Sequence, residues 1–135
     1  GAQFERQIAC RGLGGRARLM GVSSNVAGIL GDADLFLIGS RYEGYPNVII
    51  EALACGCPVI ATNCPGATAE ILGGGRHGVL VPVGDPAAMA AAMSGLINSA
   101  DRRKSLSAGG PAAVAHLAKE SIAERWIEIF EGVSR

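Results

Sequence analysis

Short apolar runs alternate along the chain with segments whose apolar residues recur at helical spacing. The runs are residues 18–22, 34–40, 58–62 and 79–81. Apolar runs of this length are typical of strands that are buried on both faces of a parallel sheet. The alternation therefore predicts an α/β fold, a Rossmann-like parallel sheet with flanking helices.

Helical spacing covers most of the chain outside these runs. The predicted helices are residues 4–11, about 24–31, 47–55, a short helix that carries Glu70, 86–99, 101–118 and a last helix from Ser121 onward. Asp85 is predicted to cap the helix that begins at Pro86, because its side chain can accept from the unpaired amides of the first turn. Met89, Met93 and Leu96 form the inward stripe of that helix.

The first helix is predicted to pack against the rest of the chain. Phe4, Ile8 and Cys10 are expected to face inward from the first helix. Ser23 or Ser24 is expected to cap the second helix, since a hydroxyl oxygen can accept from its free amides.

The C-terminal region contains two signals for helix ends. Gly109-Gly110-Pro111 is expected to break or kink the helix over residues 101–118, because proline removes a backbone hydrogen bond. Ser121 and Glu124 have the spacing of a capping box that opens the last helix. Trp126 and Phe130 on that helix are predicted to pack into the core.

The candidate chemistry concentrates in residues 40–51, where the run at residues 34–40 meets the helix at residues 47–55. Pro46 suits the first position of this helix, because it lacks the amide hydrogen that would go unpaired there. The helix is apolar almost all round and is expected to lie in the core. Its first amides lie at the positive end of a dipole, beyond the carboxyl end of a strand, where open α/β folds bind anions and nucleotides.

Glu43 and Glu51 are the unusual residues of this stretch. A carboxylate in an apolar helix is costly to bury unless it meets hydrogen-bond donors, and the paired hydroxyls of a ribose would supply two. Glu43, in the preceding loop, could accept from the hydroxyls of a sugar. The alternative for Glu43 is a solvated loop position, and for Glu51 it is a buried contact with the backbone or an arginine.

Composition narrows the classes of function. The chain has 135 residues, enough for one domain with its own core. Its 12 acidic and 12 basic residues give a formal net charge of zero, so there is no electrostatic case for nucleic-acid binding. No apolar run is long enough to span a bilayer, and the N-terminus is unlike a signal peptide, so a cytoplasmic location is expected.

The cysteines raise the question of a metal site or of disulfides. Cys55, Cys57 and Cys64, followed by His77, do not have a standard zinc-ligand spacing. We therefore expect reduced thiols and assign no metal ligand.

Several motifs, in order, carry a resemblance to a known family. They are Ser40-Arg41-Tyr42-Glu43-Gly44-Tyr45-Pro46-Asn47, Glu51-Ala52-Leu53-Ala54-Cys55-Gly56-Cys57-Pro58-Val59-Ile60-Ala61, Glu70-Ile71-Leu72, Gly78-Val79-Leu80-Val81-Pro82 and Gly84-Asp85. Over roughly residues 6–98 the chain resembles the donor-binding half of glycosyltransferase family 4. The resemblance implies the C-terminal half of a GT-B fold, transfer with retention, and the family's Glu-x7-Glu signature at Glu43 and Glu51.

The resemblance also implies roles for single residues. Glu51 matches the glutamate that holds the ribose hydroxyls of a nucleotide sugar. Glu43 matches the glutamate that lies against the donor sugar near the reacting carbon, and it is the catalytic candidate, though not as a covalent nucleophile. The other substrate-binding candidates, which match the loop and helix start whose backbone amides meet the sugar and diphosphate, are Gly44, Tyr45, Asn47 and Val48.

The chain departs from the family in what it lacks. It has no Gly-Arg-Leu-type turn with a downstream lysine, the pair that neutralises the donor diphosphate in family members, and no acceptor-binding N-terminal domain. Residues 1–135 are therefore expected to be a single, truncated donor-binding domain, inactive alone. In the family's strand order, the run at residues 18–22 would be separated from the others, so we expect a fragment with exposed strand edges or a second chain that completes the sheet.

The resemblance implies a nucleotide diphosphate sugar as donor, with no cofactor and no obligatory metal. The missing domain would bind the acceptor, a glycan, lipid or small molecule, and would provide any peripheral association with a membrane. It would also offer a surface for Trp126 and Phe130, as an alternative to the core. Two rival functions remain: a retaining glycoside hydrolase that uses the Glu43 and Glu51 pair, and a non-catalytic nucleotide-binding or interaction module.

Overall fold

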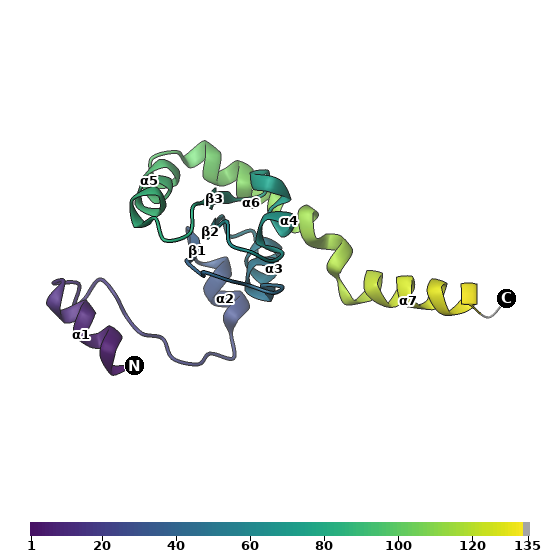
Figure 1. The fold of residues 1–135 in the computed structure, drawn as a ribbon, viewed down its shortest axis with the longest axis horizontal. Coiled ribbons are helices and arrows are strands. Elements are labelled where there is room, and N and C mark those ends of the chain that lie inside the picture. Colours follow the sequence, from purple (N-terminus) through teal and green to yellow (C-terminus); the bar gives the residue numbers. More distant parts are fainter. Residues whose placement is uncertain (134–135) are drawn as a thin grey trace.

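A parallel sheet lies at the centre of the computed structural model, which describes residues 1–133 (Figure 1). Its strands are β1 (Phe36–Ile38), β2 (Val59–Thr62) and β3 (Val79–Val81), in the order β1-β2-β3. Leu37 is in register with Ile60, and Ile60 with Val79. The predicted α/β fold with a parallel sheet is thus confirmed.

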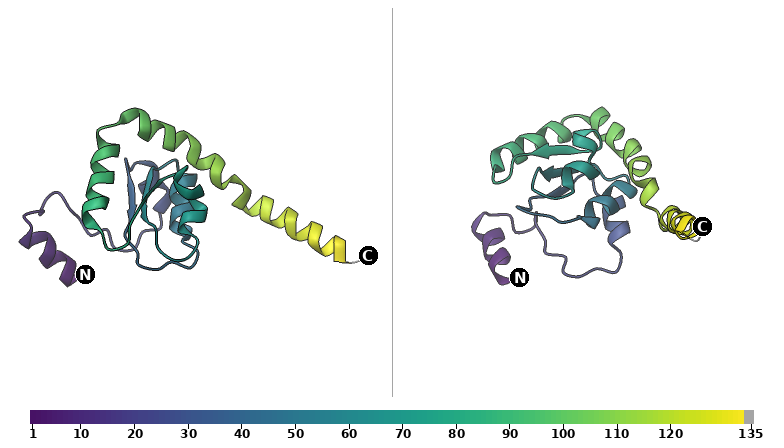
Figure 2. Two further views of the ribbon diagram at one scale, coloured as in Figure 1. Left: turned by 45° about the horizontal axis from the view of Figure 1, so that its top comes forward. Right: turned by 45° about the vertical axis from the view of Figure 1, so that its right-hand side comes forward.

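Helices cover both faces of this sheet (Figure 2). They are α1 (Ala2–Cys10), α2 (Val26–Gly31), α3 (Asn47–Ala54), α4 (Thr68–Ile71), α5 (Pro86–Ile97), α6 (Ala100–Val114) and α7 (Lys119–Val133), with the 3-10 turns η1 (Gly73–Gly75) and η2 (Ala115–Leu117). Among residues 1–133, no helix is both long and apolar enough to cross a membrane.

The core is divided in two by β2, because successive side chains of a strand point to opposite faces. Val59 and Ala61 pack with α2, α3 and the end of α6. Ile60 points the other way and packs with α5. All residues of β2 are buried as a result, as predicted for a strand that is covered on both faces.

The strand β1 is shorter and more exposed than predicted. It spans Phe36–Ile38 within the run at residues 34–40, and Leu37 keeps 39% of its surface exposed. Leu37 faces the same side as Ile60, where α5 packs on β2 and β3. Because α5 does not extend over β1, the expectation that this strand is buried on both faces was wrong.

Residues 18–22 do not form the predicted strand. Leu19, Met20 and Val22 are exposed, and no strand of the described chain pairs with this segment. An isolated strand has no partner for its backbone hydrogen bonds, so the apolar run alone does not make one here.

The N-terminal helices also differ from expectation. The helix α1 has no fully buried residue: Phe4 is 60% exposed and Cys10 is exposed, while Ile8 is half-buried. Asn25, rather than Ser23 or Ser24, caps α2, because its side chain accepts from the amide of Gly28 at 3.1 Å.

The helix α5 follows its prediction. Asp85 Oδ1 accepts from the amide of Ala88 at 2.8 Å, and Pro86 opens the helix. Leu96 is fully buried, and Met89 and Met93 pack beside it against the sheet.

The helix α6 continues through Gly109-Gly110-Pro111, where a break or a kink was predicted, so the predicted break is absent. Gly110 is buried, and a Cβ atom there would lie 2.7 Å from the carbonyl oxygen of Leu53 in α3. The missing side chain lets the two helices approach closely, and this packing keeps α6 helical despite Pro111.

The helix α7 extends away from the sheet (Figure 1). It begins at Lys119, so Ser121 and Glu124 lie inside the helix instead of opening it. Trp126 and Phe130 stack with ring centroids 5.7 Å apart but are 55% and 64% exposed. Their predicted packing into the core was wrong, because Ala118 is extended and directs α7 outward.

Candidate functional site

The candidate site lies at the carboxyl edge of the sheet, where the loop 39–46 connects β1 to α3. Pro46 is buried and is the N-terminal cap residue of α3. It was predicted to be the first helical residue, so the helix begins one residue later than that. Ile49 makes the first turn by donating its amide to the carbonyl of Pro46 at 3.0 Å. The amides of Asn47 and Val48 precede this bond and are among those that a helix start leaves free for a ligand.

The side chain of Glu43 is held by a neighbouring hydroxyl. Ser40 Oγ donates to Glu43 Oε1 at 2.5 Å, and both residues are half-buried. Glu43 is therefore half-buried and hydrogen-bonded rather than fully solvated.

The backbone around Glu43 is tied to the connection between β2 and α4. The amide of Glu43 donates to the carbonyl of Pro65 at 3.2 Å, and the amide of Ala67 donates to the carbonyl of Gly44 at 3.1 Å. A Cβ atom at Gly66 would overlap the carbonyl oxygen of Glu43, and Gly66 has a φ of +113°. The Pro65-Gly66 turn therefore supports the loop. The Pro-Gly pair signals a tight turn in the sequence, but this supporting role was not predicted.

Thr62 anchors the same loop from the end of β2. Its Oγ1 donates to the carbonyl of Ser40 at 2.5 Å, and the residue is only 5% exposed. Ser40 and Thr62 were not among the predicted site residues. Their only sequence signal is a hydroxyl at the end of each of two adjacent parallel strands.

Glu51 is exposed, contrary to the expectation of a buried carboxylate. Only one side of α3 is buried, by Ile49, Ala52 and Leu53, so the helix is not wholly internal as predicted. The side chain of Glu51 makes no hydrogen bond or ion pair within residues 1–133, where the single ion pair joins Lys119 to Glu120. The alternative for Glu51, a buried contact with the backbone or an arginine, was therefore wrong, and the carboxylate is available to a ligand.

The other predicted site residues lie around the same helix start. Gly44, Tyr45 and Asn47 are exposed, and Val48 is half-buried. The sequence-predicted residues thus form one surface that consists of the loop and the first two turns of α3.

A hollow of about 320 Å³ opens beside this surface. Gly39 and Arg41 of the loop, Thr62 of β2 and the start of α5 at Asp85 and Pro86 line it. Its position over the carboxyl ends of the strands is where open α/β sheets hold their ligands. Arg41 is the cation that lines it, and it was not among the predicted site residues.

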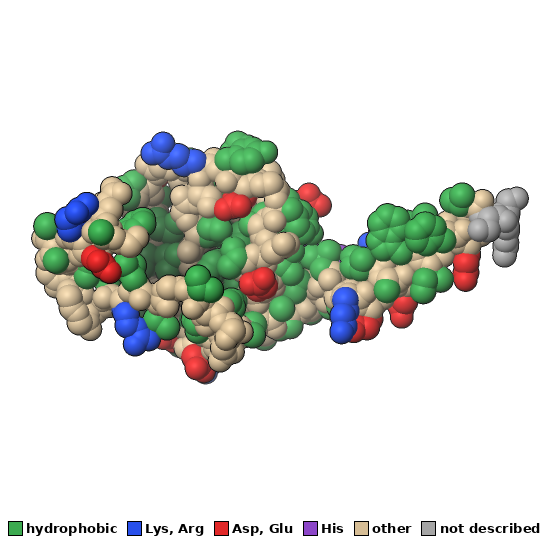
Figure 3. All heavy atoms as spheres, turned by 90° about the horizontal axis from the view of Figure 1, so that it is seen from below, with side chains coloured by type: hydrophobic (Ala, Val, Ile, Leu, Met, Phe, Trp, Pro, Cys, Tyr) green, Lys and Arg blue, Asp and Glu red, His purple; other side chains and the backbone are tan. Residues whose placement is uncertain are grey.

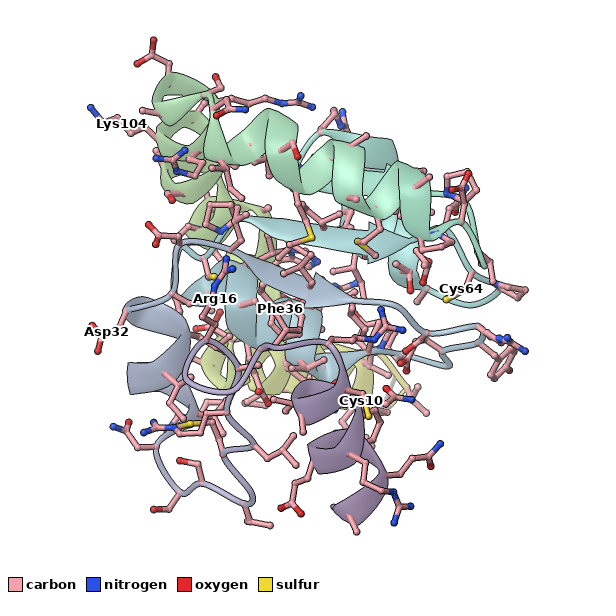
Figure 4. The ribbon with its side chains drawn as sticks, turned by 90° about the vertical axis from the view of Figure 1, so that its left-hand side faces the viewer. Cys10, Arg16, Asp32, Phe36, Cys64 and Lys104 are labelled. Atoms are coloured by element: carbon pink, nitrogen blue, oxygen red, sulfur yellow. The ribbon has the colours of Figure 1, made fainter. Side chains whose placement is uncertain are left out.

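The cysteines are free thiols. Cys57 and Cys64 are buried, and Cys64 lies in the connections at the carboxyl end of the sheet (Figure 4). Burial, followed by the nearby Cys55 and Asp34, raises the pKa of the Cys57 thiol. In the part of the chain that the structure describes, no three histidine, cysteine or carboxylate side chains gather in a way that could hold a metal ion.

Comparison with known proteins places the chain in a family. Residues 1–99 match the family model described as Glycosyl transferases group 1. The chain belongs to this family. The lipopolysaccharide core biosynthesis mannosyltransferase LpsB of Rhizobium meliloti is 29% identical over 137 aligned residues, which cover 99% of this chain and 39% of LpsB.

Solved structures of other proteins share the fold. The Anabaena protein HepE in complex with UDP superimposes with a TM-score of 0.89 at 23% identity, over 97% of this chain and 36% of HepE. The C-terminal domain of the group 1 protein LpcC from Francisella tularensis gives a TM-score of 0.71 at 25% identity, over 84% of this chain and 60% of that one. The chain thus has the α/β architecture of a GT-B glycosyltransferase domain and spans less than two fifths of LpsB and HepE.

Proposed function

We propose that this chain is the C-terminal, donor-binding part of a retaining glycosyltransferase of family 4, which transfers a sugar from a nucleotide diphosphate sugar to an acceptor hydroxyl. One observation carries the proposal. A carboxylate held in place, that of Glu43, and a free one, that of Glu51, flank the amides that open α3. Membership of the group 1 family and the binding of UDP by HepE support it.

In this proposal each group has a separate task. Glu51 accepts hydrogen bonds from the ribose hydroxyls, since its carboxylate is exposed one turn into the helix. The amides of Gly44, Asn47 and Val48 and the loop at Tyr45 meet the sugar and diphosphate, whose negative charge the positive end of α3 favours. Glu43 orients the donor sugar at the reacting carbon.

The leaving nucleoside diphosphate gains negative charge as the sugar departs. Fixed amide dipoles that point at this charge stabilise the transition state, so the proposal requires no cofactor and no obligatory metal. The acceptor, a glycan, lipid or small molecule, would bind outside residues 1–135, and we propose that the isolated chain binds the donor without completing transfer.

Calorimetric titration tests this function. UDP, GDP and ADP, each with a sugar conjugate, are titrated into the chain, into Glu51→Ala and into Glu128→Ala, an exposed position on α7 that serves as the control. We expect one nucleotide to bind the wild type and Glu128→Ala alike, and to bind Glu51→Ala at least tenfold more weakly. A chain that is folded by circular dichroism but binds none of the nucleotides would contradict the proposal.

The same titration, with a simple glycoside as a further ligand, separates the rival functions. A non-catalytic nucleotide-binding module would bind the nucleotide and gain nothing from the sugar. A retaining hydrolase would bind a glycoside without the diphosphate, and the relatives reported above are transferases.

A further inference from the structure

We propose that Ser40 is a positioning residue: its hydroxyl fixes the Glu43 carboxylate for the donor sugar, within a relay of contacts that starts at Thr62 of the sheet. This inference rests on the proposed function, because it assigns to Glu43 a ligand that only a sugar donor brings. It goes further by naming residues outside the Glu43 to Glu51 pair that set the geometry of the site.

The side chains of Ser40 and Glu43 are in direct contact. Ser40 Oγ donates to Glu43 Oε1 at 2.5 Å. A glutamate side chain has three rotatable bonds, and a charge-assisted hydrogen bond to one oxygen restricts them. The second oxygen, Oε2, then keeps its lone pairs for hydroxyl groups of a ligand.

The second step is the anchoring of Ser40 itself. Thr62 Oγ1 donates to the Ser40 carbonyl at 2.5 Å, and Thr62 is buried in β2, the central strand. The hydrogen bonds run from the sheet through Thr62 and Ser40 to Glu43. The Glu43 side chain is thereby anchored, through two hydrogen bonds, to a central strand whose residues are all buried.

The third step is the fixed backbone of Glu43. The bond from its amide to the Pro65 carbonyl and the close packing of Gly66 on its own carbonyl hold the backbone in place. With the backbone fixed there, the hydroxyl of Ser40 decides the direction of the carboxylate.

The position of Glu51 distinguishes the two carboxylates. Glu51 makes no such contact within the described residues and is exposed, so its orientation depends on the ligand. We therefore infer that removing the Ser40 hydroxyl affects recognition of the sugar and leaves recognition of the nucleotide, which belongs to Glu51, unchanged.

Titration of matched ligands tests this division. UDP and UDP-glucose, GDP and GDP-mannose, and ADP and ADP-glucose are titrated into the wild type, Ser40→Ala and Ser40→Thr. The measured quantity is the ratio of the dissociation constants of the nucleotide diphosphate and its sugar conjugate. We expect Ser40→Ala to lower this ratio at least threefold with the nucleotide affinity unchanged, and Ser40→Thr, which keeps a hydroxyl, to preserve it.

If Ser40 had a purely structural role, Ser40→Ala would weaken the binding of the nucleotide diphosphate and of its sugar conjugate equally. That result overturns the inference. An unchanged ratio in Ser40→Ala, or a wild type that gains no affinity from the sugar, overturns it as well. Failure of the wild type to bind any nucleotide contradicts the proposed function, and the claim about the side chain is then decided without ligand.

Carbon-13 NMR of the glutamate carboxyl carbons gives that ligand-free measurement. Ser40→Ala is expected to shift the Glu43 carboxyl resonance, because it removes the hydroxyl that Glu43 accepts from. The Glu51 resonance should stay in place, because Glu51 makes no hydrogen bond with Ser40, and it serves as the internal control. Unshifted Glu43 in a folded Ser40→Ala protein would show that the hydroxyl does not hold the carboxylate, and would overturn the inference independently of binding.

Discussion

The backbone of Gly66 lies against the carbonyl oxygen of Glu43, so closely that no side chain can be added at residue 66. This contact joins the connection after β2 to the loop after β1, and with it two segments that are more than twenty residues apart in the sequence. The shape of the candidate site thus depends on a glycine that carries no functional group.

Substitution Gly66→Ala is expected to lower the free energy of unfolding by about 1–3 kcal/mol, because the new Cβ overlaps Glu43 and the φ of +113° disfavours any side chain. Urea unfolding followed by circular dichroism measures this. Gly44→Ala, in the same loop but with no atom within 4 Å of its added Cβ, is the control and should have a smaller effect. Equal losses in the two variants would contradict the packing described for Gly66.

Adjacent glycines in α6 are expected to respond in opposite directions. Gly110→Ala should destabilise the protein by about 1–3 kcal/mol, because its Cβ would lie 2.7 Å from the Leu53 carbonyl oxygen and force α6 away from α3. Gly109→Ala meets nothing within 4 Å and should stabilise the helix by up to about 1 kcal/mol. Thermal unfolding of the two variants decides the point, and a stabilised Gly110→Ala protein would refute the close crossing.

The thiols are expected to react in an order set by burial. With iodoacetamide under native conditions, exposed Cys10 should be alkylated first and buried Cys57 among the last, because burial and the raised pKa leave little accessible thiolate. Mass spectrometry of peptides gives the order, and the four sites should react alike in urea. Fast native labelling of Cys57 would contradict the buried environment.

The raised pKa of Cys57 makes the free energy of unfolding depend on pH. The folded state keeps this proton to a higher pH than the unfolded state does. The free energy of unfolding should therefore fall as the pH rises past the pKa of the unfolded thiol, until the folded thiol titrates too. Cys57→Ala should lose this component of the alkaline pH dependence, and an unchanged pH profile would argue against the shift.

Truncation of Trp126 is expected to change stability by less than about 0.5 kcal/mol, because α7 contains no buried residue. Leu96→Ala, at a fully buried site in α5, should cost about 2–5 kcal/mol and serves as the comparison. Chemical denaturation measures both. A loss at Trp126 close to that at Leu96 would mean that the aromatic pair is packed in solution.

Helices and strands were predicted correctly where the local sequence signal agrees with the packing in the fold. Asp85 with Pro86 placed the start of α5, and the apolar run at residues 58–62 placed the central strand. The run at residues 18–22 shows the limit of the same argument: strand formation requires a paired neighbour, and the sequence pattern cannot tell whether one is present.

The candidate site was predictable in part. The loop and helix start around Glu43 were found, because a carboxylate beside a helix start is conspicuous in a sequence. The supports of that loop at Ser40, Thr62 and Gly66 were not found, since they act through contacts between strands whose adjacency only the fold reveals. Gly110 was misjudged for the same reason, because its value lies in a contact with α3 rather than in helix propensity.

The extended residue between η2 and α7 has a mechanical consequence. Apolar side chains gather along one side of α7 (Figure 3), and Ala118, with φ −60° and ψ 145°, sets the direction of the whole helix. The 15 residues of α7 make a rod about 22 Å long. A rotation of about 30° at this one joint would carry the far end through about 12 Å, as expected from that length. Trp126 and Phe130 lie about 10–17 Å along this rod, so the same rotation would carry them through about 5–9 Å while the loop around Glu43 stays fixed on the sheet.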